Sequence, residues 1–208
     1  TIVVPGYNEG GRLDLDALVD LAAAIDHLIL VDDGSTDDTR DLFDAVAARS
    51  DGRVTVVATG ANRGKAEAVR AGMRCALDSG ASVVGYFDAD LATPIAELLR
   101  LIDVIADRDE IDVVLASRVG LLGHTIERRA TRHYLGRLYA TAASLALGVA
   151  VYDTQCGAKL FRSTDALRAA LATPFPDRWS FDVEMLARLL APGRGVTPLP
   201  PDRILEVP

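Results

Sequence analysis

Cysteine and histidine are scarce in this sequence of 208 residues. The cysteines are Cys75 and Cys156, and the histidines, His27, His124 and His133, are scattered along the chain. Small secreted scaffolds need several disulfides, and zinc sites need clustered cysteines or histidines, so both classes are excluded. We interpret the two cysteines as free thiols in a reducing compartment, which predicts a cytoplasmic location.

Basic residues and long apolar runs are also in short supply. The chain has 22 Lys and Arg against 30 Asp and Glu, a net charge of −8. Non-specific binding to nucleic acid depends on a basic surface, so this balance argues against a nucleic-acid partner. The longest apolar stretch, Leu138 to Val151, is interrupted by Thr141 and Ser144 and is shorter than the roughly 20 residues that span a membrane. We therefore expect no membrane-spanning helix within these residues.

What the first half does contain is a regular alternation of apolar and amphipathic segments. The pattern predicts strands over 1–4, 27–31, 53–58, 82–87 and 111–116. It predicts helices over 13–25, from Ser35 with its hydroxyl as the N-terminal cap, over 64–78, and from Pro94. Apolar strands separated by helices indicate an α/β domain whose parallel sheet is covered on both faces.

The second half of the sequence is less regular. Its pattern predicts a long helix over 126–148, an extended segment over 153–161 and a helix over 181–190. The residues 192–201 are rich in proline and glycine and are predicted to end the folded pattern. We expect a single domain over residues 1–208.

Four polar clusters fall where predicted strands end. They are Tyr7-Asn8-Glu9, Asp32-Asp33-Gly34-Ser35, Asp88-Ala89-Asp90 and Ser117-Arg118. Parallel sheets bind ligands at the carboxyl ends of their strands, so the four clusters together predict one site. Two acids at the end of a buried strand need partners, and for Asp32 and Asp33 we expect the base or ribose of a nucleotide. A capped turn is the alternative.

The spacing of Asp88 and Asp90 carries the most chemical information. Two carboxylates separated by one small residue can converge on a hard cation, and Mg²⁺ and Mn²⁺ favour oxygen ligands with phosphates in the remaining positions. Ala89 leaves room for a diphosphate to approach the backbone. The alternative is an acid pair in a solvated turn, which the neighbouring clusters disfavour.

A basic loop, Asn62-Arg63-Gly64-Lys65, directly precedes a predicted helix. Cations at a helix N-terminus oppose the helix dipole, whereas an anion there is stabilised. Arg63 and Lys65 therefore fit a site at which a nucleotide or its phosphates bind. A solvated basic turn, partly balanced by Glu67, is the alternative.

A local basic island lies between Ser117 and Tyr152, where Glu127 is the only acid. Its arginines are Arg118, Arg128, Arg129, Arg132 and Arg137. Arg128 and Arg132 lie one turn apart on the predicted helix, which fits contact with a membrane surface and a lipid phosphate. An arginine face exposed to solvent on a packing helix is the alternative.

Read in order, these motifs resemble the family 2 glycosyltransferases of the GT-A fold. The matching segments are Pro5-Gly6-Tyr7-Asn8-Glu9, Val31-Asp32-Asp33-Gly34-Ser35-Thr36-Asp37, Asn62-Arg63-Gly64-Lys65 and Asp88-Ala89-Asp90. Within the family, residues 153–161 and 178–186 are similar to dolichyl-phosphate β-glucosyltransferases and bacterial polyprenyl-phosphate glycosyltransferases. One departure is Leu91-Ala92-Thr93 after the metal motif, where eukaryotic members commonly carry Gly-Ala-Thr.

The resemblance implies a Rossmann-like, mostly parallel sheet flanked by helices. It implies that residues 1–118 bind a nucleotide sugar and that residues 119–208 form the acceptor side. UDP-glucose is the favoured donor, a hexose is transferred with inversion, and the cofactor is Mg²⁺ or Mn²⁺ held by Asp88 and Asp90. The implied donor-binding residues are Pro5, Tyr7, Glu9, Asp33, Arg63, Lys65, Asp88 and Ala89.

The resemblance also implies a polyprenyl or dolichyl phosphate as acceptor, reached through peripheral contact with the cytoplasmic face of a membrane. Periodicity alone gives Asp153 and Asp182 no role. By resemblance, the residues for the acceptor phosphate are Arg128, Arg132 and Gln155. By the same resemblance, the catalytic residues are Asp90, Arg118, Asp153 and Asp182.

Three other functions fit parts of the pattern. A family 2 transferase with a soluble sugar or polysaccharide acceptor shares every donor motif. A nucleotidyltransferase shares the sheet and the metal, but its glycine- and lysine-rich loop after the first strand is not matched by Gly6-Tyr7-Asn8-Glu9. A non-catalytic module that binds nucleotide sugars is the third, and the intact Asp88 and Asp90 pair argues against it.

Overall fold

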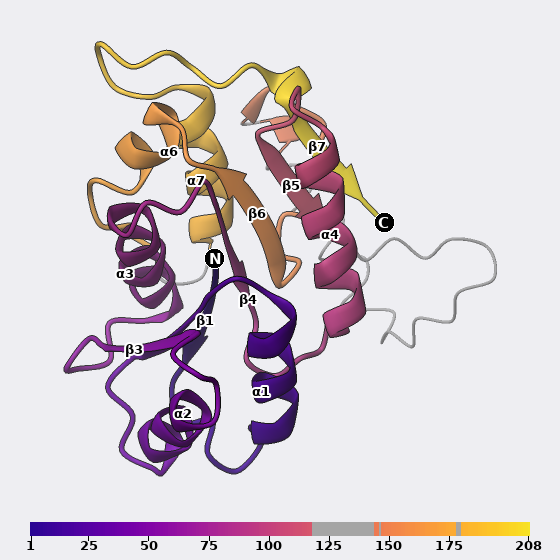
Figure 1. Ribbon diagram of the computed structural model, residues 1–208. Helices are drawn as coiled ribbons and strands as arrows, with labels where there is room; N and C mark the ends of the chain where they lie inside the picture. The colour runs from indigo at the N-terminus through magenta and orange to yellow at the C-terminus, as the bar shows by residue number, and fades with distance from the viewer. Residues whose placement is uncertain (118–143, 146, 178–179) are drawn as a thin grey trace, which may run out of the picture.

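The structure is a computed structural model that describes residues 1–117, 144–145, 147–177 and 180–208. Its strands are β1 Ile2–Gly6, β2 Leu28–Asp32, β3 Val54–Ala58, β4 Val83–Phe87, β5 Val113–Ala116, β6 Ala158–Arg162 and β7 Ile204–Val207. They form one sheet in the order β3-β2-β1-β4-β6-β5-β7 (Figure 1). The five strands predicted in the first half are confirmed, with small shifts at their ends.

The sheet is mostly parallel, and β6 is the exception. β1 pairs in parallel with both β2 and β4, whereas β6 lies between β4 and β5 and runs antiparallel to each. β7 returns in parallel beside β5 at the sheet edge. Because β6 runs the other way, the loop that enters it meets the loops that leave β4 and β5 at the same edge.

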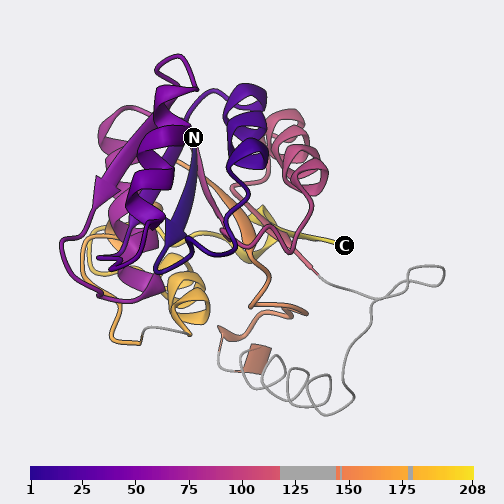
Figure 2. The same ribbon diagram turned by 90° about the horizontal axis from the view of Figure 1, so that it is seen from below.

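Helices cover both faces of this sheet. Their bounds are α1 Leu15–Ala24, α2 Thr39–Ala48, α3 Lys65–Asp78, α4 Ile95–Asp107, α6 Asp165–Ala170 and α7 Phe181–Leu190, with a short 3₁₀ helix over Pro201–Arg203. Val3 and Ile29 face α3, α6 and α7, while Ile2 and Leu28 face α1, α2 and α4. Side chains alternate between faces along a strand, so consecutive apolar residues fill both layers (Figures 1 and 2).

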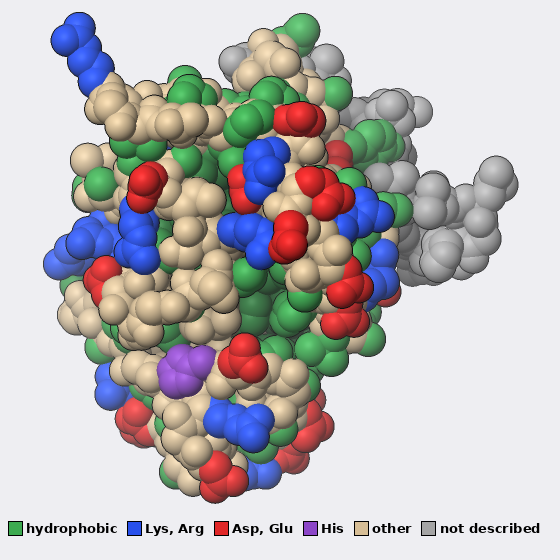
Figure 3. Space-filling model, turned by 45° about the horizontal axis from the view of Figure 1, so that its top comes forward, with side chains coloured by type: hydrophobic (Ala, Val, Ile, Leu, Met, Phe, Trp, Pro, Cys, Tyr) green, Lys and Arg blue, Asp and Glu red, His purple; other side chains and the backbone are tan. Residues whose placement is uncertain are grey.

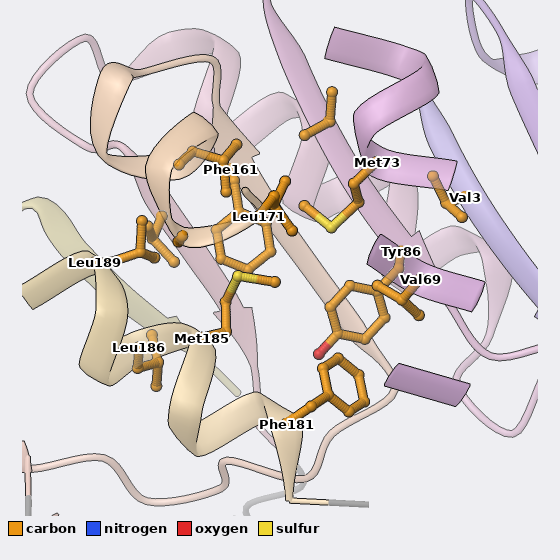
Figure 4. Packing of buried hydrophobic residues seen from close by; sticks show 14 of the residues in the cluster. Val3, Val69, Met73, Tyr86, Phe161, Leu171, Phe181, Met185, Leu186 and Leu189 are labelled. Carbon is orange, nitrogen blue, oxygen red and sulfur yellow. The ribbon is translucent and has the colours of Figure 1, made fainter. Parts of the chain in front are cut away.

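Aromatic packing joins the C-terminal helix to the middle of the sheet. Tyr86 of β4 is almost fully buried, and its ring centroid lies 5.7 Å from that of Phe181 at the start of α7. Val69 and Met73 of α3 lie on the other side of Tyr86 (Figure 4). The helix predicted over 181–190 is confirmed by α7, and its first turn packs against β4, the strand that ends just before Asp88.

The prediction that Ser35 caps a helix is wrong. The helix α2 begins at Thr39, and Ser35 instead lies in the loop between β2 and α2. The Ser35 amide donates to Asp32 Oδ1 at 2.9 Å, and its hydroxyl accepts from the Asn8 amide at 3.1 Å. Ser35 therefore ties the loop after β2 to the loop after β1.

The prediction that the folded pattern ends at 192–201 is also wrong. β7 follows this segment and pairs with β5, and Asp165–Ala170 forms a helix that the sequence pattern did not predict. The extended segment predicted over 153–161 becomes a turn followed by β6. The helix predicted over 126–148 lies almost entirely outside the described residues.

Two further observations concern the helices and the surface charge of the described residues. None of the helices in the described ranges is long and apolar enough to cross a membrane. On the face that Figure 3 shows, acidic and basic side chains are interspersed rather than gathered by sign.

Candidate functional site

A pocket of about 520 Å³ lies at the edge where β1, β2 and β4 end, the edge that faces the viewer in Figure 2. Its lining residues are Pro5, Gly6, Tyr7, Glu9, Arg12, Asp33, Asn62, Gly64, Lys65, Ala68, Asp88, Ala89 and Asp90. Loops that are far apart in the sequence thus meet at one place, and three of the four strand-end clusters contribute to it. Ser117 of the fourth cluster is not part of the lining, and Arg118 lies outside the described residues. Of the expected donor residues, only Arg63 is not part of this lining.

The side chain of Asp33 accepts hydrogen bonds from the backbone of the basic loop. Its side chain is buried, and Oδ1 accepts from the Thr59 hydroxyl at 2.9 Å and from the Arg63 amide at 3.0 Å. Oδ2 accepts from the Gly64 amide at 2.7 Å. The buried carboxylate therefore has protein partners of its own, where the sequence led us to expect a nucleotide. It fixes the loop that presents Lys65 while still lining the pocket.

Asp88 lies between a cation and a glycine. Its Oδ1 lies 2.5 Å from Lys65 Nζ, in a pair with both side chains about one-third exposed, yet no hydrogen bond of good geometry reaches that buried oxygen. A Cβ atom on Gly157 would come within 2.3 Å of Oδ2, and the Asp88 amide donates to the Gly157 carbonyl at 3.0 Å. A carboxylate oxygen that lies against a cationic group and accepts no hydrogen bond of good geometry can also serve as a ligand for a divalent cation.

Asp90 is exposed at the pocket, and its Oδ1 accepts from the Ala92 amide at 3.1 Å. Leu91, which lies between Asp90 and Ala92, has a φ of 50°, a backbone region that glycine adopts more easily. Among the described residues, no three His, Cys, Asp or Glu side chains gather to form a metal site. Two carboxylates fit Mg²⁺ or Mn²⁺ only if phosphates and water complete the shell.

Arg12 is a pocket residue that the sequence analysis missed. Its guanidinium pairs with the Glu9 carboxylate. The pKa of Arg12 is raised, first by that hydrogen bond, then by the charge of Glu9 and to a smaller extent by that of Asp90. Arg12 follows two glycines in a loop, where no periodicity marks it.

Asp182 lies in a buried cluster beneath the site and is not part of the pocket lining. It pairs with Lys159 Nζ at 2.8 Å and accepts a hydrogen bond from the Tyr86 hydroxyl. The pKa of Tyr86 is raised well above its usual value, chiefly by burial and then by the charge of Asp182. Lys159 also donates to the Cys156 carbonyl at 2.6 Å, one residue before Gly157.

Asp153 and Gln155 lie in the loop that enters β6, and neither lines the pocket. The Gln155 amide donates to Asp153 Oδ1 at 3.1 Å. The loop is held by Glu206 of β7, a residue that the sequence analysis did not single out. Arg118, Arg128 and Arg132 lie outside the described residues.

Comparison with solved structures identifies the fold. A mannosyltransferase from Pyrobaculum calidifontis, solved with GDP-Man and Mn²⁺, superimposes with a TM-score of 0.55 at 20% identity, covering 100% of this chain and 56% of that one. That likeness establishes the GT-A fold. The family described as Glycosyl transferase family 2 matches residues 1–167, so the chain belongs to this family.

Two curated relatives show which members of the family the chain is similar to. A dolichyl-phosphate β-glucosyltransferase from Dictyostelium discoideum is 29% identical over 202 residues, covering 89% of this chain and 60% of the relative. A polyprenol monophosphomannose synthase from Mycolicibacterium smegmatis is 29% identical over 201 residues, covering 96% of this chain and 75% of the relative. The first three relatives that the chain matches are covered over about half to three-fifths of their length.

Proposed function

We propose that this chain is a metal-dependent, inverting glycosyltransferase that moves a hexose from a nucleotide sugar to a polyprenyl phosphate. The observation that carries the proposal is the pocket in which Asp88 and Asp90 meet the loops after β1 and β2 and before α3. Such a pocket offers carboxylates for a cation, a lysine for phosphate, and the loop after β1 for a nucleoside. We propose UDP-glucose as the donor.

The names of the relatives support the acceptor. Both the dolichyl-phosphate β-glucosyltransferase and the polyprenol monophosphomannose synthase are named for polyprenyl lipids, although their sugars differ. We therefore base the lipid phosphate on what these names share, whereas UDP-glucose rests on the sequence resemblance alone. Such a lipid lies in a membrane, so the proposal includes peripheral contact between the acceptor side of the chain and the cytoplasmic face of that membrane.

On the donor side, the residues fall into three groups by role. Pro5, Tyr7 and Glu9 would contact the nucleoside, and Asp33 would hold the basic loop so that Lys65 reaches the diphosphate. Asp88 and Asp90 would hold Mg²⁺ or Mn²⁺. The ion supplies positive charge that stabilises the departing nucleoside diphosphate.

On the acceptor side, the lipid phosphate is already anionic near neutral pH and needs little general-base assistance. One of its oxygens forms a bond to the anomeric carbon while the bond from that carbon to the diphosphate breaks. Attack from the opposite face inverts the configuration. Arg118, Arg128 and Arg132, with Gln155, would orient the phosphate, and Asp153 would line this side.

The first test is transfer by the purified chain across a panel of UDP- and GDP-sugars, with Mg²⁺ or Mn²⁺ and a short polyprenyl phosphate. A parallel arm with soluble sugars tests the other acceptor class. We expect turnover with the polyprenyl phosphate and a UDP-hexose. Turnover with soluble sugars alone would contradict the acceptor, and no turnover with any donor would contradict the enzyme.

The metal is tested by Asp90→Asn. We expect the rate of transfer to fall by about 100-fold or more. With the ion bound more weakly, the transition state loses several kcal/mol of charge stabilisation. Asp103→Asn on the exposed side of α4 is the matched control and should transfer normally. Wild-type activity of the Asp90 variant in EDTA would contradict a metal at this position.

A further inference from the structure

The side chain of Glu206 in β7 accepts two hydrogen bonds from the loop that enters β6. Its Oε2 accepts from the Tyr152 amide at 2.8 Å, and its Oε1 accepts from the Asp153 amide at 2.6 Å. One carboxylate thus binds two consecutive backbone N–H groups, an arrangement in which both bonds are charge-assisted. The partners are 54 and 53 residues away in the sequence, so no local turn imposes this contact.

Glu206 is itself held firmly at the edge of the sheet. Its residue pairs with Leu115 in the register of β5 and β7, and the next residue, Val207, accepts from the Ser117 amide at 2.8 Å. The side chain therefore projects from a strand whose backbone is fixed independently of the loop. A fixed strand can transmit its position to a loop through two short hydrogen bonds.

The loop held in this way makes hydrogen bonds at both of its ends. At its start Glu206 holds Tyr152 and Asp153, and the Asp153 carboxylate turns back to accept from the Gln155 amide. At its end the Gly157 carbonyl accepts from the Asp88 amide. Between these points lie the two residues assigned above to the acceptor side. The same segment thus links the edge strand β7 to the carboxylate proposed to bind the metal.

We propose that Glu206 is a positioning residue that holds the loop of Asp153 and Gln155 in the geometry required for transfer to the acceptor. This inference rests on the proposed function, which gives that loop its acceptor role. Glu206 is not among the residues that line the donor pocket, so we infer that it acts through the loop. It also lies beyond residues 1–167, the part that matches the family.

The proposal is tested with Glu206→Ala and Glu206→Gln in the full chain. The glutamine retains one carbonyl oxygen that accepts one of the two N–H groups, so it should rescue part of the effect. Glu110→Ala, an exposed glutamate just before β5, is the matched control. Circular dichroism and urea unfolding establish that each variant is folded, and the glutamine variant carries the test if the alanine variant does not fold.

The first readout is amide hydrogen exchange, which does not depend on activity. In Glu206→Ala we expect faster exchange in a peptide that covers residues 151–155, with unchanged exchange in the peptide that covers β5. Unchanged exchange over 151–155 would overturn the proposal, because Glu206 would then hold nothing. The Glu110 control should match the wild type in both peptides.

The second readout separates the acceptor side from the donor side. We expect kcat for transfer to fall between roughly 10-fold and 100-fold in Glu206→Ala, as small misplacements near a reacting centre do. The KM for the nucleotide sugar should stay within about twofold of the wild type. A merely structural role would raise the donor KM as well, and a variant with wild-type kcat would overturn the proposal.

A double-mutant cycle with Asp153→Ala tests whether Glu206 acts through the loop. If it does, the losses in kcat are not additive, and Glu206→Ala adds little once Asp153 is removed. Additive losses would overturn the proposal. If the wild-type chain transfers no sugar, the proposed function is overturned, and with it the role of Glu206 in transfer. Whether Glu206 holds the loop is decided separately, by hydrogen exchange.

Discussion

At the scale of single residues, Gly157 determines where the Asp88 carboxylate can lie. The carboxylate rests over the glycine so closely that a Cβ atom would meet Oδ2 at 2.3 Å and Cγ at 2.6 Å. Real Cβ atoms do not approach so near, so any other residue there must displace Asp88 or the strand end. The absence of a side chain at position 157 is therefore part of the proposed metal site.

We predict that Gly157→Ala weakens Mn²⁺ binding in the presence of UDP by roughly tenfold or more, since metal ligands tolerate little displacement. Gly193→Ala is the control, because a Cβ at that position meets nothing within 4 Å. Isothermal titration calorimetry measures both variants. If the Gly157 variant bound Mn²⁺ as the wild type does, Asp88 would not be a ligand.

Residue patterns predicted most of the residues that line the pocket but not how these residues are held. The acids at the ends of β2 and β4 marked the pocket correctly, because buried strands rarely end in charge without reason. The partners of Asp33 come from residues about thirty positions along the chain, and local patterns carry no such information. The same is true of Asp182, whose partners Tyr86 and Lys159 lie on two different strands.

At the scale of elements, the alternation in the first half predicted the layers because each strand and its helix are neighbours in sequence. The position of β6 between β4 and β5 depends on pairing over more than forty residues. The return of β7 to β5 depends on a still longer separation. Prolines and glycines in 192–201 signalled a break, and they cannot report that the chain pairs again after it.

The ion pair between Lys159 of β6 and Asp182 of α7 is nearly inaccessible to solvent, with side chains 2% and 6% exposed. Removing one member of such a pair leaves an uncompensated buried charge. We predict that Lys159→Met lowers the free energy of unfolding by about 3–5 kcal/mol, as measured by urea denaturation.

The control for this prediction is the double variant Lys159→Met with Asp182→Asn. It leaves no buried charge, and the asparagine oxygen can still accept from the Tyr86 hydroxyl, so most of the stability should return. A single variant as stable as the wild type would show that the pair contributes nothing to the docking of α7.

At the scale of the whole molecule, the sheet places loops from distant parts of the chain along one edge. Parallel strands bring the loops after β1, β2 and β4 to that edge, and the reversed β6 brings the loop of Asp153 there too. Donor and acceptor roles proposed for the two halves of the chain thus depend on one continuous sheet. Ligand binding at its edge should consequently stabilise the entire fold rather than a single loop.

This leads to a prediction for global unfolding. A ligand at 100 times its Kd stabilises the native state by about 2.7 kcal/mol. For a chain of this size, each kcal/mol raises Tm by roughly 2–4 °C. We therefore expect UDP at that excess to raise Tm by roughly 5–10 °C in Mn²⁺, measured by calorimetric or fluorescence-monitored melting.

The metal dependence of that shift decides what it means. In EDTA the diphosphate loses the ion that joins it to Asp88 and Asp90, so the shift should largely disappear, and Asp90→Asn should lose it even in Mn²⁺. Asp103→Asn should keep the full shift. A GDP arm run in parallel reports which base the pocket favours, because only the preferred nucleotide reaches the larger shift at equal concentration. An identical shift with and without Mn²⁺ would mean that the nucleotide binds without the two aspartates, and the proposed metal site would have to be abandoned.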